Sequence, residues 1–245
     1  MNESRVEVES VDGVADGRMF LPDGAGPFPL VVQYMDAGGL RSALTQLAAP
    51  LVAAGYAVLQ PNLYWRAGPY APFDARTVFG DAPERDRLMA LMRTVKPADV
   101  MDDTRRFVER LAEDPRVATE RLRFVGYCLG GRAAFVAAIT FAERVAAAAA
   151  IHAGGLVTDA PDSPHRGVGA IRARVYVGVA DADASCTPAQ QHALRDALEL
   201  AGVDATVELY PGARHGFAMP DFAVYDAAAA ARQGAAVLEL FASVR

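Results

Sequence analysis

The sequence has few cysteines and no strongly basic segment. Its two cysteines, Cys128 and Cys186, do not form a disulfide framework, so we expect two free thiols in a reducing compartment. The formal net charge of -6 and the lack of a basic cluster argue against a nucleic-acid partner. No H-E-x-x-H motif, paired C-x-x-C motif or dinucleotide fingerprint occurs. We therefore expect no metal and no organic cofactor.

Long apolar runs are also missing. The longest, VAAAAAI, is too short to cross a bilayer. The first residues, MNESRVEVES, lack the apolar region of a secretory signal. We therefore expect a cytoplasmic protein without membrane contact.

Short apolar runs alternate with helical patterns along the 245 residues. The predicted strands are Arg5–Ser10, Gly17–Leu21, Leu30–Tyr34, Ala57–Gln60, Arg121–Val125, Ala147–Ile151, Arg174–Val179 and Ala205–Tyr210. The predicted helices are Ser42–Ala54, Ala98–Leu111, Cys128–Phe141, Pro188–Ala201 and Val224–Ala242. This order predicts one α/β domain over residues 1–245, with a mostly parallel central sheet of about eight strands flanked by helices. The first two strands are expected to form an antiparallel hairpin at its edge.

One segment, residues 62–97, breaks the alternation. It is too long for a simple connection and contains several prolines and arginines. We predict a loop followed by a short helix, lying near the mouth of a site.

The stretch GYCLGG at residues 126–131 lies between a predicted strand and a predicted helix. It has the G-x-nucleophile-x-G form of a nucleophile elbow, in which flanking glycines permit a sharp turn that exposes the nucleophile. The following helix would direct its N-terminus at the sulfur of Cys128 and favour negative charge there. The alternative is a buried cysteine in a tight turn, which the pentapeptide alone does not exclude.

An elbow nucleophile requires an acid and then a histidine, each just past a later strand. Of the four histidines, only His215 lies in a loop after a strand that leaves room for an earlier acid. Asp181 ends the run VYVGVAD and is the favoured acid, with Asp183 as its near competitor. A surface-loop role for His215 is the alternative, but the three positions together favour catalysis.

Three segments together resemble the dienelactone hydrolase family of the α/β-hydrolase superfamily. They are the cysteine elbow, the segment QPNLYWR at residues 60–66 and the histidine loop GARHGF at residues 212–217. The likeness runs from about Leu30 to the last helix. It implies an α/β-hydrolase fold, and Asp181 falls on the acid of the family.

The resemblance also assigns roles around the nucleophile. Family members carry a glutamate that contacts the resting thiol, and here Asp36 has that position with a side chain one methylene shorter. Its alternative role is a cap for the following helix. The backbone N–H groups of Ala37 and Leu129 would form the oxyanion hole.

Family members hold the carboxylate of dienelactone between two arginines. Met219 stands where one of them is expected. The resemblance places Arg87 at the position of the other, and a solvated helix face is its alternative role. Half of the clamp is therefore absent, which argues against dienelactone itself. Another arginine, Arg41, Arg66 or Arg76, is the alternative anion partner. Tyr64 and His152 complete the candidate substrate-binding residues, together with Arg87 and Met219.

These features predict a cysteine-dependent hydrolase of a small ester or lactone that works through a thioester. The alternatives are an acyl transferase on the same fold and a non-catalytic binding module with a relict site.

Overall fold

An eight-stranded sheet forms the centre of the molecule, and the computed structural model describes residues 2–244. The strands are β1 (Asn2–Ser10), β2 (Gly13–Leu21), β3 (Phe28–Tyr34), β4 (Ala57–Pro61), β5 (Val117–Tyr127), β6 (Val145–Ile151), β7 (Arg174–Ala182) and β8 (Ala205–Arg214). Their order across the sheet is β1-β2-β4-β3-β5-β6-β7-β8. β2 pairs antiparallel with β1 and β4, and the remaining pairs are parallel. The predicted sheet and its antiparallel edge hairpin are confirmed.

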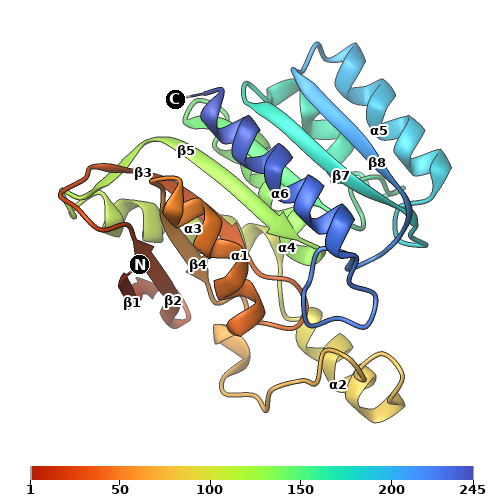
Figure 1. Cartoon of the computed structure of the whole chain (residues 1–245), viewed down its shortest axis with the longest axis horizontal. Coiled ribbons are helices and arrows are strands. Elements are labelled where there is room, and N and C mark those ends of the chain that lie inside the picture. Colours follow the sequence, from red (N-terminus) through yellow and green to blue (C-terminus); the bar gives the residue numbers. More distant parts are fainter. Residues whose placement is uncertain (1, 245) are drawn as a thin grey trace.

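Helices cover both faces of this sheet (Figure 1). They are α1 (Ser42–Ala53), α2 (Ala82–Met92), α3 (Pro97–Leu111), α4 (Leu129–Thr140), α5 (Pro188–Leu200) and α6 (Ala227–Ala242), with short 3-10 helices η1 (Trp65–Ala67) and η2 (Pro164–Ala170). α1 and α6 cross in front of the sheet in Figure 1, whereas α4 passes behind it. Every residue of β6 is buried, as expected for a central parallel strand covered on both faces.

Most strands are longer than predicted, and several helix ends differ by one to three residues. The difference at the end of β7 bears on the site. α6 begins at Ala227 instead of Val224, because the side chain of Asp226 caps its first turn through the Ala228 and Ala229 N–H groups. β7 continues to Ala182, beyond the predicted end at Val179.

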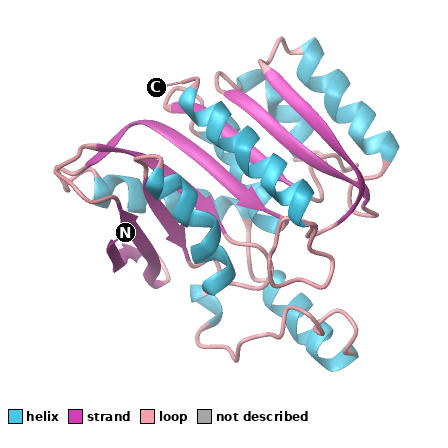
Figure 2. Ribbon diagram, in the orientation of Figure 1, coloured by secondary structure: helices cyan, strands magenta, loops and turns pink. Residues whose placement is uncertain are grey.

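The segment of residues 62–97 carries η1 and α2 and projects from the edge of the sheet toward which the arrowheads of the parallel strands point (Figure 2). Its start is fixed to α3, because Trp65 Nε1 donates to Asp103 at 2.9 Å and the Arg66 guanidinium pairs with the same carboxylate. The helical part of this segment is α2. Among residues 2–244, no helix is long and apolar enough to span a membrane.

Candidate active site

Cys128 occupies a strained turn between β5 and α4. Its backbone has φ 56° and ψ -117°, a conformation that residues other than glycine rarely adopt. A Cβ added to Gly126 would lie 1.9 Å from the carbonyl oxygen of Gly130, and one added to Gly130 would lie 2.3 Å from that of Met35. Both glycines are therefore required by close backbone approach, as the elbow pattern predicts.

Cys128, His215 and Asp183 form a continuous hydrogen-bonded chain, called here the Cys–His–Asp cluster. His215 Nε2 lies 3.0 Å from Cys128 Sγ, and His215 Nδ1 lies 2.7 Å from Asp183 Oδ2. Asp183 is buried, and its other oxygen accepts from the Ser185 N–H at 2.8 Å and the Ser185 hydroxyl at 2.6 Å. The cluster has the order and geometry of a nucleophile, a base and an orienting acid.

The prediction that Asp181 lies against His215 is wrong, and Asp183 takes that place. The physical reason is the end of β7. The strand extends through Ala182, so Asp183 is the first residue beyond it. Asp181 is exposed, and its carboxylate accepts from the Gly212 N–H at 3.1 Å.

The surroundings of His215 favour a positively charged ring. Burial alone would lower the pKa of His215, but its hydrogen bonds to Asp183 and Cys128 raise it to about 10. Burial would likewise raise the pKa of Asp183, but the hydrogen bonds from His215 and Ser185 hold it below its usual value. Burial, with Asp183 nearby, raises the pKa of the second thiol, Cys186, to about 11.

The residues predicted to form the oxyanion hole lie at two adjacent element ends. Ala37 follows β3, and Leu129 opens α4. Within residues 2–244, neither of their N–H groups donates to another residue. Tyr64 is fully buried, and its hydroxyl donates to the Ala37 carbonyl at 2.9 Å. Tyr64 was predicted to bind substrate, but the structure shows it bracing the loop of Ala37.

Asp36 pairs with Arg41, which is neither of the roles predicted for it. It is fully buried, and both of its oxygens accept from the Arg41 guanidinium, one of them from Nη2 at 3.0 Å. Burial raises the pKa of Asp36, and the Arg41 charge opposes that effect. Its hydrogen bonds in the described part of the chain therefore reach neither Cys128 nor the first turn of α1.

His152 is buried directly beneath the elbow. Its Nδ1 accepts from the Cys128 N–H at 3.2 Å, and its ring centroid lies 5.2 Å from that of His215 and 5.5 Å from that of Phe217. Its backbone has φ 38°, and its Nε2 has no hydrogen-bond partner among residues 2–244. His152 is 1% exposed, so it supports the elbow and is not open to substrate, contrary to the prediction that it binds substrate.

The other two predicted substrate contacts also lie elsewhere. Met219 is fully buried and does not face an open pocket. Arg87 pairs with Glu84, donates to the Ala71 carbonyl at 2.8 Å and stacks 3.8 Å from the Phe73 ring. These contacts hold Arg87 within its own segment, so the structure gives it no contact with the Cys–His–Asp cluster.

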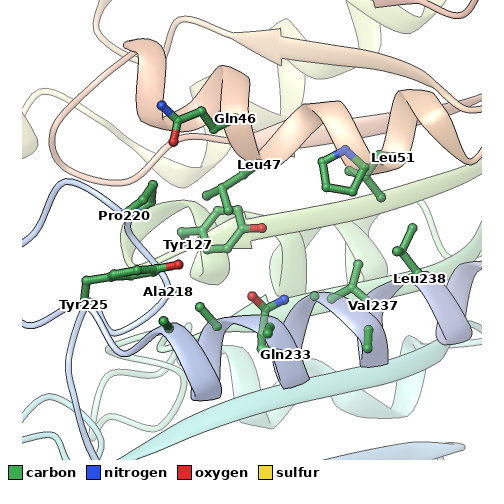
Figure 3. A pocket seen from close by; sticks show the side chains of 16 residues that line it. Gln46, Leu47, Leu51, Tyr127, Ala218, Pro220, Tyr225, Gln233, Val237 and Leu238 are labelled. Carbon is green, nitrogen blue, oxygen red and sulfur yellow. The ribbon is translucent and has the colours of Figure 1, made fainter.

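A cavity of about 480 Å³ lies between α1 and α6 (Figure 3). Leu47 and Leu51 of α1, Val237 and Leu238 of α6 and the ring of Tyr127 contribute to its wall. No member of the Cys–His–Asp cluster lines it, so it is separate from the chemistry described above.

Sequence reasoning missed the partners that complete the site. Ser185 donates to Asp183, and Asp221 receives two hydrogen bonds from Arg41. Arg41 had been named only as one of three alternative anion partners. Asp221 follows the histidine loop, but no local pattern pairs it with a residue 180 positions away. No group of three or more His, Cys, Asp or Glu side chains in residues 2–244 is placed to hold a metal ion.

Residues 15–245 match the model of the dienelactone hydrolase family. The carboxymethylenebutenolidase of Pseudomonas sp. (strain P51) is 35% identical over 140 residues, which cover 55% of this chain and 56% of that protein. A "Putative carboxymethylenebutenolidase" of Synechocystis sp. is 26% identical over 92% of this chain and 90% of its own length. The crystal structure of a "Putative Dienelactone Hydrolase" from Klebsiella pneumoniae superposes with a TM-score of 0.84, at 25% identity and 99% coverage of both chains.

Proposed function

The chain belongs to the dienelactone hydrolase family, and from this premise we propose that it hydrolyses small carboxylic esters or lactones with Cys128 as the nucleophile. The observation that carries the proposal is the Cys–His–Asp cluster, with its contacts of 3.0 Å and 2.7 Å. The relatives named carboxymethylenebutenolidase support the same substrate class. A thiol nucleophile also fits the reducing cytoplasm expected for two free cysteines.

In the first half of the reaction, Cys128 Sγ forms a bond to the carbonyl carbon of the substrate. The electron pair of the C=O double bond moves to oxygen, where the Ala37 and Leu129 N–H groups stabilise it. The tetrahedral intermediate collapses, the C–O bond to the leaving group breaks, and His215 protonates the departing oxygen. The product of this half is a thioester on Cys128.

In the second half, water attacks the thioester while His215 accepts its proton. The C–S bond then breaks, the acid leaves, and the proton returns to the Cys128–His215 pair. Asp183 orients the imidazole in both halves and stabilises its positive form.

The test compares the two cysteines with p-nitrophenyl acetate as substrate and iodoacetamide as label. We expect Cys128→Ala to abolish turnover and remove the rapidly alkylated site, whereas Cys186→Ala retains most of the activity. Cys186 is the matched control because it is the other free thiol and is buried. Equal losses in the two variants, or alkylation of Cys186 first, would contradict the proposal. Adding an alcohol acceptor separates hydrolysis from acyl transfer, since a transferase forms the new ester in preference to the free acid.

A further inference from the structure

Arg41 binds two carboxylates that come from different loops. Its Nη1 and Nη2 donate to Asp36, at the end of β3. Its Nε and Nη2 donate to Asp221, beyond the histidine loop, at 2.6 Å and 2.9 Å. The N–H groups through which Arg41 could bind a further carboxylate are therefore already used by Asp36 and Asp221.

The two carboxylates differ in how accessible they are. The Asp36 side chain is fully buried, the Arg41 side chain is 15% exposed, and the Asp221 side chain is 35% exposed. Asp36 is thus the fixed inner partner of the guanidinium. Asp221 is the outer partner, on the side from which a dissolved molecule arrives.

This ion cluster lies next to the predicted oxyanion hole. Arg41 donates to the Gly39 carbonyl at 3.2 Å, and a Cβ on Gly38 would lie 2.6 Å from its Nη1. Those two glycines directly follow Ala37. A substrate carbonyl held by the Ala37 N–H would therefore place its neighbouring substituent beside the cluster.

Aromatic rings flank the outer carboxylate. Phe222, the residue after Asp221, lies with its ring 5.4 Å from the Arg41 guanidinium carbon. The same ring packs against Phe79 of the projecting segment, with a centroid distance of 6.0 Å, and Phe79 is 49% exposed. The surroundings of the cluster thus suit an apolar substituent better than a charged one.

We infer that Asp221 is a specificity-determining residue, which occupies the outer side of Arg41 and makes the site select uncharged esters or lactones over those with a carboxylate near the reacting carbonyl. Asp221 holds its negative charge on the outer side of the guanidinium, so a further anion that approaches from this side is repelled. An anionic substrate would also have to displace an existing bidentate pair. This inference rests on the proposed ester or lactone hydrolysis.

The experiment measures kcat/KM for γ-valerolactone and for its analogue in which a carboxylate replaces the ring methyl group. In the wild type we expect the neutral lactone to be preferred. Asp221→Asn frees one side of Arg41, so the ratio of carboxylated to neutral kcat/KM should rise by about tenfold to a hundredfold. Most of the change should lie in KM, and added salt should weaken it. The further change Arg41→Met in the Asp221→Asn background should remove the gain.

Asp181→Asn is the matched control, since it removes the same charge from an exposed carboxylate at the end of β7 that does not contact Arg41. Its ratio should equal that of the wild type. Asp221→Ala serves as a second variant if the asparagine perturbs the loop. A wild type that prefers the carboxylated lactone, or a ratio unchanged in both Asp221 variants, overturns the inference and leaves the proposed function intact.

Calorimetric titration with benzoate separates this inference from the proposed function. We expect Asp221→Asn to bind benzoate at least about tenfold more tightly than the wild type does. If no lactone or ester is turned over, the proposed function fails, and the benzoate result still decides the role of Asp221. Equal benzoate affinities in wild type and variant contradict that role.

Discussion

Asp181 and Asp183 lie on the same stretch of chain, but only Asp183 is buried against His215. We therefore expect Asp183→Asn to lower kcat by about a thousandfold or more, because an asparagine no longer holds the imidazole in the required tautomer and charge state. Asp181→Asn should retain activity within a few-fold of the wild type. The measurement is kcat with p-nitrophenyl acetate. The reverse ranking would mean that the end of β7 is misplaced.

His152 should make the stability of the protein depend on pH. Burial, and then the charge of His215, lower the pKa of His152 to about 3. In the unfolded chain a histidine takes up a proton near pH 6.5. As the pH falls from about 6.5 toward 3, the unfolded state therefore binds a proton that the folded state does not bind. Stability should fall by up to about 1.4 kcal/mol per pH unit from this residue.

The free energy of unfolding in urea is measured for the wild type and for His152→Phe between about pH 4.5 and 7.5. This range includes the pKa of a histidine in the unfolded chain. We expect the wild-type value to decrease more steeply with acid than that of the variant, in which this proton uptake is absent. His192→Gln is the control, since His192 is exposed on α5. Parallel curves for wild type and His152→Phe would show that His152 is protonated in the folded state.

At the element scale, α6 contains a glycine that its surroundings do not require. Gly234 lies inside the helix and beside the cavity of Figure 3, and a Cβ added to it would have no atom within 4 Å. Gly234→Ala should therefore increase the free energy of unfolding by about 0.5–1 kcal/mol, because it reduces the entropy of the unfolded chain.

The comparison for this prediction is Gly130→Ala in α4, where the new Cβ would collide with the Met35 carbonyl oxygen at 2.3 Å. That change should destabilise the protein even though alanine favours helices. Urea unfolding of both variants measures the effect. Destabilisation by Gly234→Ala would indicate that α1 approaches α6 more closely than the structure shows.

At the scale of the whole molecule, the projecting segment of residues 62–97 tests whether the chain folds as one unit. Trp65, the single tryptophan, lies in this segment and is hydrogen-bonded to Asp103 of α3. Phe73, Leu88 and Leu91 of the same segment are buried. We expect unfolding in urea to give the same midpoint by Trp65 fluorescence and by far-ultraviolet circular dichroism.

The opposite result is a fluorescence transition that precedes the loss of secondary structure. It would mean that the segment detaches before the sheet unfolds, so that the chain contains a separable unit. Arg66→Gln is a useful perturbation, because Arg66 pairs with both Asp103 and Asp12. It should weaken the anchoring of the segment and lower the fluorescence midpoint more than the dichroism midpoint.

The sequence by itself determined the strands, most helices and the elbow, because these depend on local properties. Strand and helix periodicity is read over a few residues. The steric requirement at Gly126 lies within the turn itself, because a Cβ there would collide with the carbonyl oxygen of Gly130. His215 was found for the same reason, since its loop follows a recognisable strand.

The tertiary structure alone decided which side chains meet. The choice between Asp181 and Asp183 depends on where β7 stops, and the ends of elements are the least predictable features of a sequence. Asp36 and Arg41 share the connection between β3 and α1, but Asp221 lies 180 residues beyond Arg41 and becomes its neighbour only when the sheet has formed. Their charges compete for one guanidinium in space, and no sequence period records that competition.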